Sequence, residues 1–471
     1  MVFNSFIFLF AFLPILLAGF KLCNHIWGAK AGTIFLVLAS LVFYGWNYPQ
    51  CLPVLLGSIL LNYLLAKCLS NKRVLAIGII VNVGVLAFFK YGKMLWGIDS
   101  SIMAAPGISF FTFSQIAFLV ETYRKNLGRM SVADYSLYIT FFPKLMQGPL
   151  VQPQKFGEKS DSEKKDCWEV FLRKLLLLTL GLFKKVILAD TLGQAVNIGY
   201  AGISTLNSLD ALIVMLSYTL QLYFDFSGYC DMAMAIAGFL GYELPLNFDS
   251  PYKAVNIMDF WKRWHITLTK FLTAYVYIPL GGNRKGKIRM YVNFLLVFLV
   301  SGIWHGAGWQ FIVWGMMHGV LYVITRALHK EKAVQDNKLV HGMKVFLTFL
   351  YVNVAWVFFR APSVSDAVML LKRIFTGGFG RVNWELAGAF NLDEFWYVIK
   401  VLGVDKWQYA HYIIMVVLLV AMLFLIWAVP NAVTIARKSK LRVGTVMVMA
   451  VLFVWSVISF SGVSTFLYFN F

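Results

Sequence analysis

The fold of this chain is decided by residues 291–326, YVNFLLVFLVSGIWHGAGWQFIVWGMMHGVLYVITR, in which the first charged side chain is Arg326. A helical crossing of a hydrocarbon core needs about 20 apolar residues, so this stretch has room for two short crossings. Three glycines interrupt it near the middle: Gly302, Gly306 and Gly308. We expect a helical hairpin whose backbone opens at these glycines and lines a cavity at membrane depth.

One imidazole, that of His305, lies near the tip of this hairpin. Counting from Arg289, sixteen helical residues rise about 24 Å, which places His305 at or beyond the middle of the membrane. An ionisable side chain at this depth is costly and therefore indicates a functional site, and an imidazole suits proton transfer near neutral pH. From the residues alone, a catalytic base and a structural histidine bonded to a neighbouring carbonyl both remain open.

Apolar stretches of this kind recur along the whole chain. Hydrophobic residues make up 60% of the 471 residues and charged residues 14%, whereas soluble domains average roughly 45–50% and about 25%. The pattern predicts an all-α, polytopic membrane protein with about eleven crossings and several re-entrant or interfacial helices. The expected spans are 4–22, 32–48, 50–66, 74–96, 104–121, 136–150, 168–189, 209–224, 228–242, 290–304, 307–325, 343–359, 409–429 and 443–461.

The net charge of +20 comes from basic residues that cluster in short loops between the apolar stretches. Loops of this kind are typically cytoplasmic, so we expect residues 253–289 in the cytoplasm and the more acidic residues 376–408 outside. Lys21 and Lys30 hold the end of an uncleaved first span on the cytoplasmic side. The same charges suit the anionic headgroups of membrane lipids. The sequence contains no soluble basic module that would indicate nucleic-acid binding.

Residues 254–280 mix Trp and Tyr with Lys and Arg, a composition typical of a helix lying at the membrane interface. Its large apolar side chains fall at near-helical spacing on one side: Trp261, Trp264, Leu268, Phe271 and Leu272. His265 lies on or beside this helix at the cytoplasmic boundary. An interfacial histidine packed between tryptophans and a second catalytic or donor-positioning histidine both remain open.

Two aspartates, Asp225 and Asp231, interrupt another apolar stretch. Gln221 and Asp225 are four residues apart, as are Ser227 and Asp231, so each pair shares a helical face. A buried polar network between helices is the first interpretation, and a proton relay or contact with a substrate is the second. A lone histidine on the return helix of the hairpin, His318, is interpreted as structural. The five cysteines are scattered and no spacing suggests zinc, so we expect no metal site.

Five motifs closely resemble those of the membrane-bound O-acyltransferases, and within that family the bacterial alginate and peptidoglycan O-acetyltransferase branch. They are FFPKLMQGPL (141–150), QLYFDFSGYCDMAMAIAGFLGY (221–242), LNFDSPY (246–252), FWKRWHITLTKFLTAYVYIPLGGNR (260–284) and SGIWHGAGWQFIVWGMMHG (301–319). The opening MVFNSFIFLFAFLP and the terminal FLYFNF fit the same branch. The resemblance implies a ring of tilted helices around a central tunnel. It also implies one transmembrane domain, 1–471, with N-terminal spans in 1–100, a catalytic core in 104–360, and an outward loop and C-terminal spans in 361–471.

The resemblance assigns roles to particular residues. The family's catalytic histidine corresponds to His305, through the motif WHG, and its second histidine to His265, through WKRWH. Residues expected along the tunnel or at the substrate are Trp304, Asp225, Gln221, Asn247, Tyr252 and Trp261. Arg284 and Lys285 follow two glycines, and two interpretations stay open for them: a topology signal, or contacts to the phosphates of a coenzyme A donor.

The function that follows is transfer of acetyl from cytoplasmic acetyl-coenzyme A to an extracytoplasmic polysaccharide, in a bacterial inner membrane. Acetyl-coenzyme A acts here as a substrate, with no bound cofactor, and an extracytoplasmic SGNH-type transferase is the expected partner. One alternative is the D-alanyl transfer protein of teichoic acid modification, and another is a proton-coupled transporter. The acceptor polymer and the choice between direct transfer and an acyl-enzyme remain open.

Overall fold

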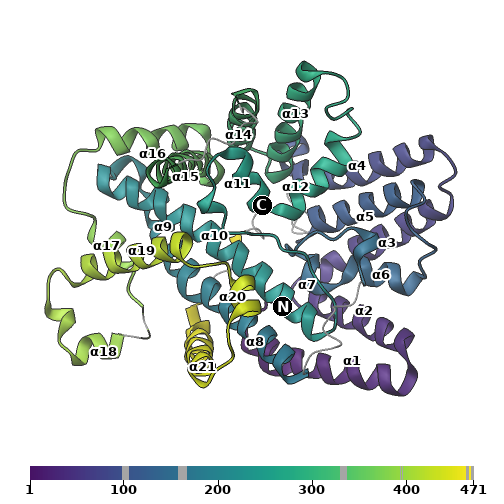
Figure 1. The fold of residues 1–471 in the computed structure, drawn as a ribbon, viewed down its shortest axis with the longest axis horizontal. Coiled ribbons are helices and arrows are strands. Elements are labelled where there is room, and N and C mark those ends of the chain that lie inside the picture. The colour runs from purple at the N-terminus through teal and green to yellow at the C-terminus, as the bar shows by residue number, and fades with distance from the viewer. Residues whose placement is uncertain are drawn as a thin grey trace. The chain divides into compact units, whose positions relative to one another are not determined.

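A computed structural model describes residues 1–97, 106–157, 167–328, 337–392, 394, 396–462 and 466–467, and every element in them is helical (Figure 1). The described residues form two compact units. Unit 1 contains Met1–Leu178 and Tyr229–Pro245, and unit 2 contains Thr179–Gly228 and Leu246–Leu467. Because α8 and α10 each contribute residues to both units, the division leaves the prediction of one transmembrane domain untested.

Unit 1 is built mainly from the N-terminal helices. Its elements are η1 (Ile7–Phe12), α1 (Leu13–Trp27), α2 (Ala29–Gly45), η2 (Pro49–Cys51), α3 (Leu52–Lys67), α4 (Lys72–Trp96), α5 (Ile108–Tyr123), α6 (Val132–Thr140), α7 (Phe142–Leu145), η4 (Pro153–Lys155) and most of α8 (Cys167–Phe183). Helix α3 is joined to α4 by two amide hydrogen bonds between Asn62 and Asn82, of 3.1 and 2.6 Å. These paired amides satisfy each other, as buried polar groups in an apolar helix pair must.

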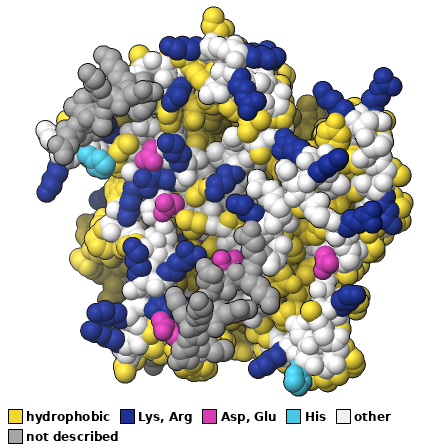
Figure 2. All heavy atoms as spheres, turned by 45° about the vertical axis from the view of Figure 1, so that its right-hand side comes forward, with side chains coloured by type: hydrophobic (Ala, Val, Ile, Leu, Met, Phe, Trp, Pro, Cys, Tyr) yellow, Lys and Arg dark blue, Asp and Glu magenta, His cyan; other side chains and the backbone are white. Residues whose placement is uncertain are grey.

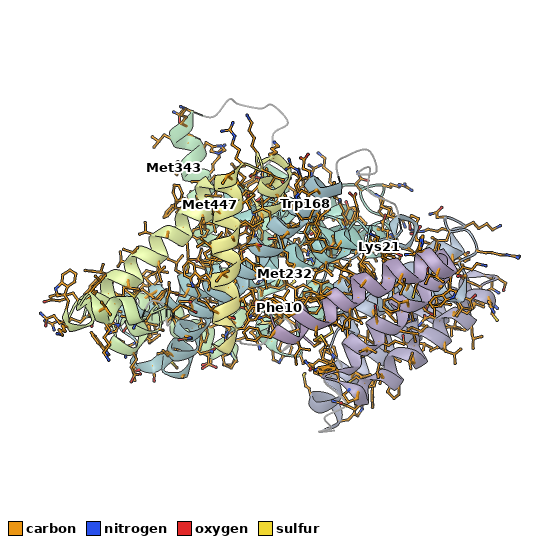
Figure 3. All side chains as sticks on the ribbon, turned by 90° about the horizontal axis from the view of Figure 1, so that it is seen from below. Phe10, Lys21, Trp168, Met232, Met343 and Met447 are labelled. Atoms are coloured by element: carbon orange, nitrogen blue, oxygen red, sulfur yellow. The ribbon has the colours of Figure 1, made fainter. Side chains whose placement is uncertain are left out.

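The core of unit 1 is an aromatic cluster around Phe3. Its ring stacks on Tyr229 at 4.9 Å and packs against Phe43 and Phe142 at 5.5 and 6.1 Å. Along the first span, Phe10 lies near one end and Lys21 toward the other, as predicted for a span with a charged end (Figure 3). The expected span 136–150 is instead the pair α6 and α7, which at 9 and 4 residues are too short to cross the membrane.

Unit 2 contains the remaining helices. They are η6 (Lys184–Ala189), α9 (Asp190–Ala201), η7 (Ile203–Thr205), most of α10 (Ser208–Phe239), η8 (Pro251–Lys253), α11 (Ile257–Arg263), α12 (Ile266–Leu272), η9 (Thr273–Tyr277), α13 (Lys287–His305), α14 (Trp309–Leu328), α15 (Lys338–Arg360), α16 (Val364–Thr376), α17 (Trp384–Gly388), α18 (Trp396–Val401), η11 (Val404–Lys406), α19 (Ala410–Ala428), α20 (Ala432–Lys438), α21 (Val443–Ile458) and η12 (Ser459–Gly462).

The helical, polytopic fold class is confirmed. Eight helical stretches among the described residues are long and apolar enough to cross a membrane, and α2 and α21 are shorter apolar helices. Large apolar side chains lie exposed along them, including Val292, Val300 and Ile303 on α13, as expected where lipid replaces water. On the face drawn in Figure 2, Lys and Arg side chains are far more frequent than Asp and Glu side chains.

A second span prediction is also wrong. Residues 209–224 and 228–242 were expected as two spans, but α10 is a single helix of 32 residues that continues through Gly228. A glycine weakens a helix by about 1 kcal/mol relative to alanine and does not by itself end it. Here Gly228 packs tightly, because a Cβ at this position would lie 2.9 Å from the carbonyl oxygen of Gly181. The glycine therefore marks a close helix contact.

The predicted hairpin is present as α13 and α14, which lie side by side (Figure 1). Two glycines allow this close packing. A Cβ at Gly302 would lie 2.5 Å from the carbonyl oxygen of Phe311, and a Cβ at Gly315 would lie 2.5 Å from that of Phe298. The expected opening lies at Gly306 and Gly308, between the end of α13 at His305 and the start of α14 at Trp309, whereas Gly302 lies within α13.

The interfacial segment forms two short helices with a sharp change of direction between them. Helix α11 ends at Arg263, and α12 starts at Ile266 with His265 as its N-cap. The apolar residues predicted to share one side are all buried: Trp261, Trp264, Leu268, Phe271 and Leu272. The break follows from the backbone of His265, whose φ of 43° and ψ of 51° lie in the left-handed region.

Candidate active site

Three histidines of unit 2 alternate with three tryptophans in one continuous array. The ring of Trp304 lies 6.5 Å from His265 and 4.6 Å from His305. Beyond His305, Trp314 packs at 5.0 Å, and His318 follows at 5.1 Å from Trp314. The array ends at Trp261, 5.1 Å from His318. Residues from α11, the α11–α12 junction, α13 and α14 thus meet in one place. His265, expected at the cytoplasmic boundary, and His305, expected at or beyond mid-membrane, therefore do not differ in depth as the sequence predicted.

His305 is held at the C-terminal end of α13 by aromatic rings on several sides. Its side chain is 4% exposed, and the rings of Trp314 and Phe359 each lie 5.0 Å away. The interplanar angle to Trp314 is 90°, an edge-to-face arrangement that fixes the plane of the imidazole. The apolar sequence around WHG therefore gives a histidine with a restricted orientation.

His265 is oriented by Asn247. The amide oxygen of Asn247 accepts hydrogen bonds from the Thr267 backbone N–H (3.1 Å) and the Thr267 hydroxyl (2.8 Å), and it lies 3.1 Å from Nδ1 of His265. A backbone N–H can only donate, so the Asn247 atom is the oxygen and His265 Nδ1 carries the proton. The other nitrogen, Nε2, is then a lone-pair acceptor. It is buried without a hydrogen-bond partner among the described residues.

Two further features distinguish His265. Burial lowers its pKa to about 3, so its imidazole is neutral at physiological pH. Its left-handed backbone conformation is unusual for a residue with a Cβ, and such strain, of about 1–3 kcal/mol, clusters at active sites. Two contacts hold this strained, neutral histidine: the hydrogen bond to Asn247 and the ring of Phe226, which lies edge-on at 4.8 Å.

His318, interpreted from the sequence as a structural histidine, lies in the same array. The indole N–H of Trp261 donates to His318 Nδ1 at 3.4 Å, which leaves the His318 proton on Nε2. That Nε2 is buried and has no hydrogen-bond partner among the residues that the structure describes. The sequence signal was the spacing of Trp314 and His318, four residues apart on one face of α14.

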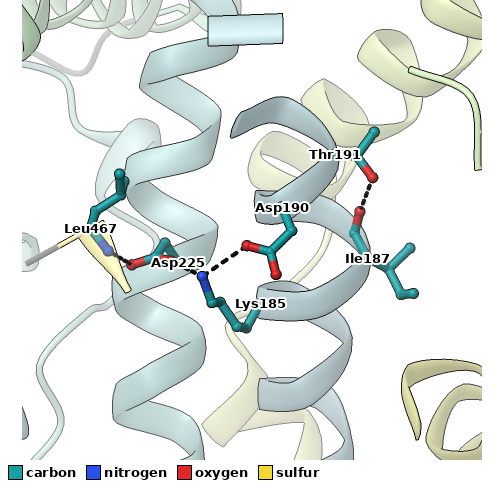
Figure 4. Close-up of polar contacts among 6 residues, drawn as sticks. All are labelled: Lys185, Ile187, Asp190, Thr191, Asp225 and Leu467. Atoms are coloured by element: carbon teal, nitrogen blue, oxygen red, sulfur yellow. Dashed lines mark hydrogen bonds and ion pairs between the residues drawn. The ribbon is translucent and has the colours of Figure 1, made fainter. Parts of the chain in front are cut away.

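Asp225 belongs to a buried ion cluster (Figure 4). Lys185 Nζ lies 2.8 Å from Oδ1 of Asp190 and 2.8 Å from Oδ1 of Asp225, and Oδ2 of Asp225 accepts the Leu467 backbone N–H at 3.2 Å. The ring of Phe466 covers the ammonium group at 4.6 Å. These contacts match the interpretation of Asp225 as part of a buried network. Lys185 and Asp190 were not among the expected site residues.

The other predicted site residues lie in different surroundings. The Tyr252 hydroxyl donates to the carbonyl of Thr219 at 2.8 Å, a bond that holds η8 against α10. Gln221 is buried with its Oε1 unpartnered among the described residues. Arg284 and Lys285 are exposed on the turn before α13. That turn contains glycines with positive φ at Gly281, Gly282 and Gly286.

In the described part of the chain, no group of three or more His, Cys, Asp or Glu side chains is placed to hold a metal ion. What the array offers instead is acid–base chemistry. One imidazole with a fixed tautomer and another with a fixed ring plane flank a single indole. Such groups can accept a proton from a hydroxyl or orient it by hydrogen bonding.

Comparison with known proteins gives a consistent result. Residues 41–360 match the family model of the membrane-bound O-acyltransferases. A peptidoglycan O-acetyltransferase of Helicobacter pylori is 39% identical in an alignment that covers 79% of this chain and 79% of the relative. A probable alginate O-acetylase of Pseudomonas aeruginosa is 33% identical in an alignment that covers 82% of this chain and 76% of the relative. A teichoic acid D-alanyltransferase of Streptococcus thermophilus is 27% identical in an alignment that covers 55% of this chain and 69% of the relative.

Proposed function

The chain belongs to the membrane-bound O-acyltransferase family, and on that premise we propose that it moves acetyl from cytoplasmic acetyl-coenzyme A to hydroxyl groups of an extracytoplasmic polysaccharide. The family makes it an acyltransferase integral to a membrane. The relatives act on peptidoglycan or alginate by name, so an envelope or exopolysaccharide sugar is the acceptor class. The bacterial inner membrane is the location that this donor and this acceptor require.

In this proposal His305 is the general base. Its neutral imidazole takes the proton of the acceptor hydroxyl while the hydroxyl oxygen attacks the thioester carbonyl. A C–O bond forms, the C–S bond breaks, and the departing thiolate receives the proton. Proton transfer by a positioned base typically contributes about 10²–10⁴-fold to the rate. The observation that supports this role most directly is the fixed ring of His305, held between Trp304, Trp314 and Phe359.

His265 has a complementary role in the same step. Its Nε2 lone pair is buried and its Nδ1 proton is bound to Asn247. It therefore accepts, but does not donate, a hydrogen bond from the acceptor hydroxyl or from a bound water. The ring of Trp304 lies between the two imidazoles. It therefore limits the size of the group that can reach both of them.

Replacement of His305 by Ala tests the proposal. We expect H305A to remain folded and membrane-inserted but to lose at least about 10²-fold in the rate of coenzyme A release from acetyl-coenzyme A. The matched control is His341→Ala, because His341 is exposed on α15 outside the array. Retention of full activity by H305A would contradict the assignment, provided that H341A is equally active.

The donor distinguishes the two acyl-transfer alternatives. The D-alanyl alternative is supported by the teichoic acid D-alanyltransferases among the relatives, at 27% identity over about half of this chain. Parallel assays with acetyl-coenzyme A and with a D-alanyl carrier-protein thioester decide between them, and we expect turnover only with acetyl-coenzyme A. The transporter alternative is set aside, because the family is a family of acyltransferases.

We place two further parts of the reaction on either side of the membrane. Arg284 and Lys285, exposed on the predicted cytoplasmic loop, contact the donor phosphates. Outside, an SGNH-type transferase completes acetylation of the polymer. Acetylation of the polysaccharide should then require both this chain and the SGNH-type transferase. Replacement of Arg284 and Lys285, which removes the contacts to the coenzyme A phosphates, should raise KM for acetyl-coenzyme A without lowering kcat.

A further inference from the structure

Unit 2 contains a groove between the interfacial helices and the hairpin, with a cavity volume of about 220 Å³. Helices α11 and α12 form one wall, and α13 and α14 form the other. Most of the lining is hydrocarbon or aromatic, from Trp261, Leu268, Leu272, Phe294, Val297 and Phe298. The groove is therefore suited to a flexible apolar chain.

The groove follows one face of α13. Phe294, Phe298 and Ser301 are spaced by four and three residues and all line it. From Phe294 to Ser301 the helix rises about 10 Å. At Ser301 the groove ends one helical turn before His305. At Phe294 its other end faces the start of α13 at Lys287, on the predicted cytoplasmic side.

Two cations border the groove. Lys262 lines the groove and is exposed. Arg326 is exposed and follows the lining residue Tyr322 by four residues on α14, so the two side chains share one face of that helix. Among the described residues, neither cation forms an ion pair, and the nearby carboxylate of Asp259 is bound to Arg263 at 2.8 Å.

We propose that this groove binds one acyl chain of an anionic phospholipid, whose phosphate is bound by Lys262 and Arg326. A free phosphate would leave the apolar walls empty, and a neutral lipid would leave the two cations without a counterion. An anionic lipid satisfies both. The same leaflet carries the anionic headgroups that attract basic residues, at about 1 kcal/mol for each Lys or Arg. This lipid site goes beyond the acetyl transfer and does not depend on it.

Native mass spectrometry of the purified full-length chain in detergent tests this site, with phosphatidylglycerol and phosphatidylcholine as probes. We expect phosphatidylglycerol to remain bound and phosphatidylcholine to be lost. Lys262→Ala should weaken phosphatidylglycerol binding about fivefold, the equivalent of about 1 kcal/mol. Val297→Trp should abolish it by filling the groove.

Matched controls separate the groove from the general lipid-facing surface. Val300→Trp places the same indole on the exposed face of α13, and Lys270→Ala removes an exposed charge of α12 that does not line the groove. Both should bind phosphatidylglycerol as the unaltered chain does, and so should H305A, whatever its activity. Equal binding by K262A, V297W and both controls would overturn the proposal. Displacement of the lipid by coenzyme A would also overturn it, because the groove would then be a donor channel.

Discussion

At the scale of single residues, the most informative group is the Asn247–His265 pair. The Asn247 oxygen fixes the His265 tautomer, because the same oxygen already accepts two hydrogen bonds from Thr267. The sequence places these residues 18 positions apart and gives no sign of the bond. A site residue can thus act by orienting another, and this role is visible only in the folded chain.

Asn247→Asp tests whether His265 must be neutral. The new carboxylate keeps the acceptor oxygen but adds a negative charge beside the imidazole, which raises the His265 pKa by about 1–3 units or more. Below the raised pKa His265 becomes protonated and its Nε2 can no longer accept. We therefore expect kcat/KM of N247D to fall on the acid side of its pH profile, and to begin falling at a higher pH than kcat/KM of the unaltered enzyme does. An unchanged acid limb would show that the His265 lone pair is not used.

The buried ion cluster gives a prediction about stability. Lys185 faces two carboxylates, so Asp225→Asn keeps its pair with Asp190, whereas Lys185→Met removes the same ammonium group from both carboxylates. Breaking a buried pair typically costs about 3–5 kcal/mol. We expect K185M to lower the thermal unfolding temperature in detergent far more than D225N does. The reverse order would mean that the cluster does not stabilise through its charges.

At the scale of elements, the α13–α14 hairpin depends on glycine contacts. Gly302→Ala would place a Cβ 2.5 Å from the backbone oxygen of Phe311, so the helices must separate and Trp314 must move relative to His305. We expect a lower melting temperature and reduced acetyl transfer. Gly342→Ala is the control, because nothing lies within 4 Å of its Cβ. There the higher helix propensity of alanine should be neutral or stabilising, by up to about 1 kcal/mol.

At the scale of the whole molecule, the charge distribution predicts the orientation in the membrane. Asn283 lies in the basic loop before α13, and Arg381 lies in the stretch expected outside; both are exposed. In a background without the native cysteines, Asn283→Cys should react with a membrane-impermeant maleimide only after the cells are broken, so that the reagent reaches the cytoplasmic face of the membrane. Arg381→Cys should react in intact cells. Labelling of both from the same side would contradict the predicted topology.

The sequence predicted the helix positions well where apolar length alone decides them. Spans such as 290–304 and 343–359 correspond to α13 and α15, because the requirement for about 20 apolar residues is local. It failed at residues 225–227, on either side of which two spans, 209–224 and 228–242, were expected, whereas α10 continues through them. An aspartate that ends an apolar span and one that pairs with a cation of another helix have the same local sequence. Only the packing partner, here Lys185 for Asp225, distinguishes them.

The helical membrane class and the family follow from local sequence alone, because hydrophobic length, basic loops and the WH motifs are properties of neighbouring residues, and the same motifs predict His305 and His265 as the candidate catalytic residues. Only the tertiary structure decided that Asn247 orients His265, that tryptophans separate three histidines, and that Lys185 neutralises Asp225. These groups lie on different helices. Their hydrogen bonds, ring planes and charge pairs exist only once the helices have packed, so no local pattern could have specified them.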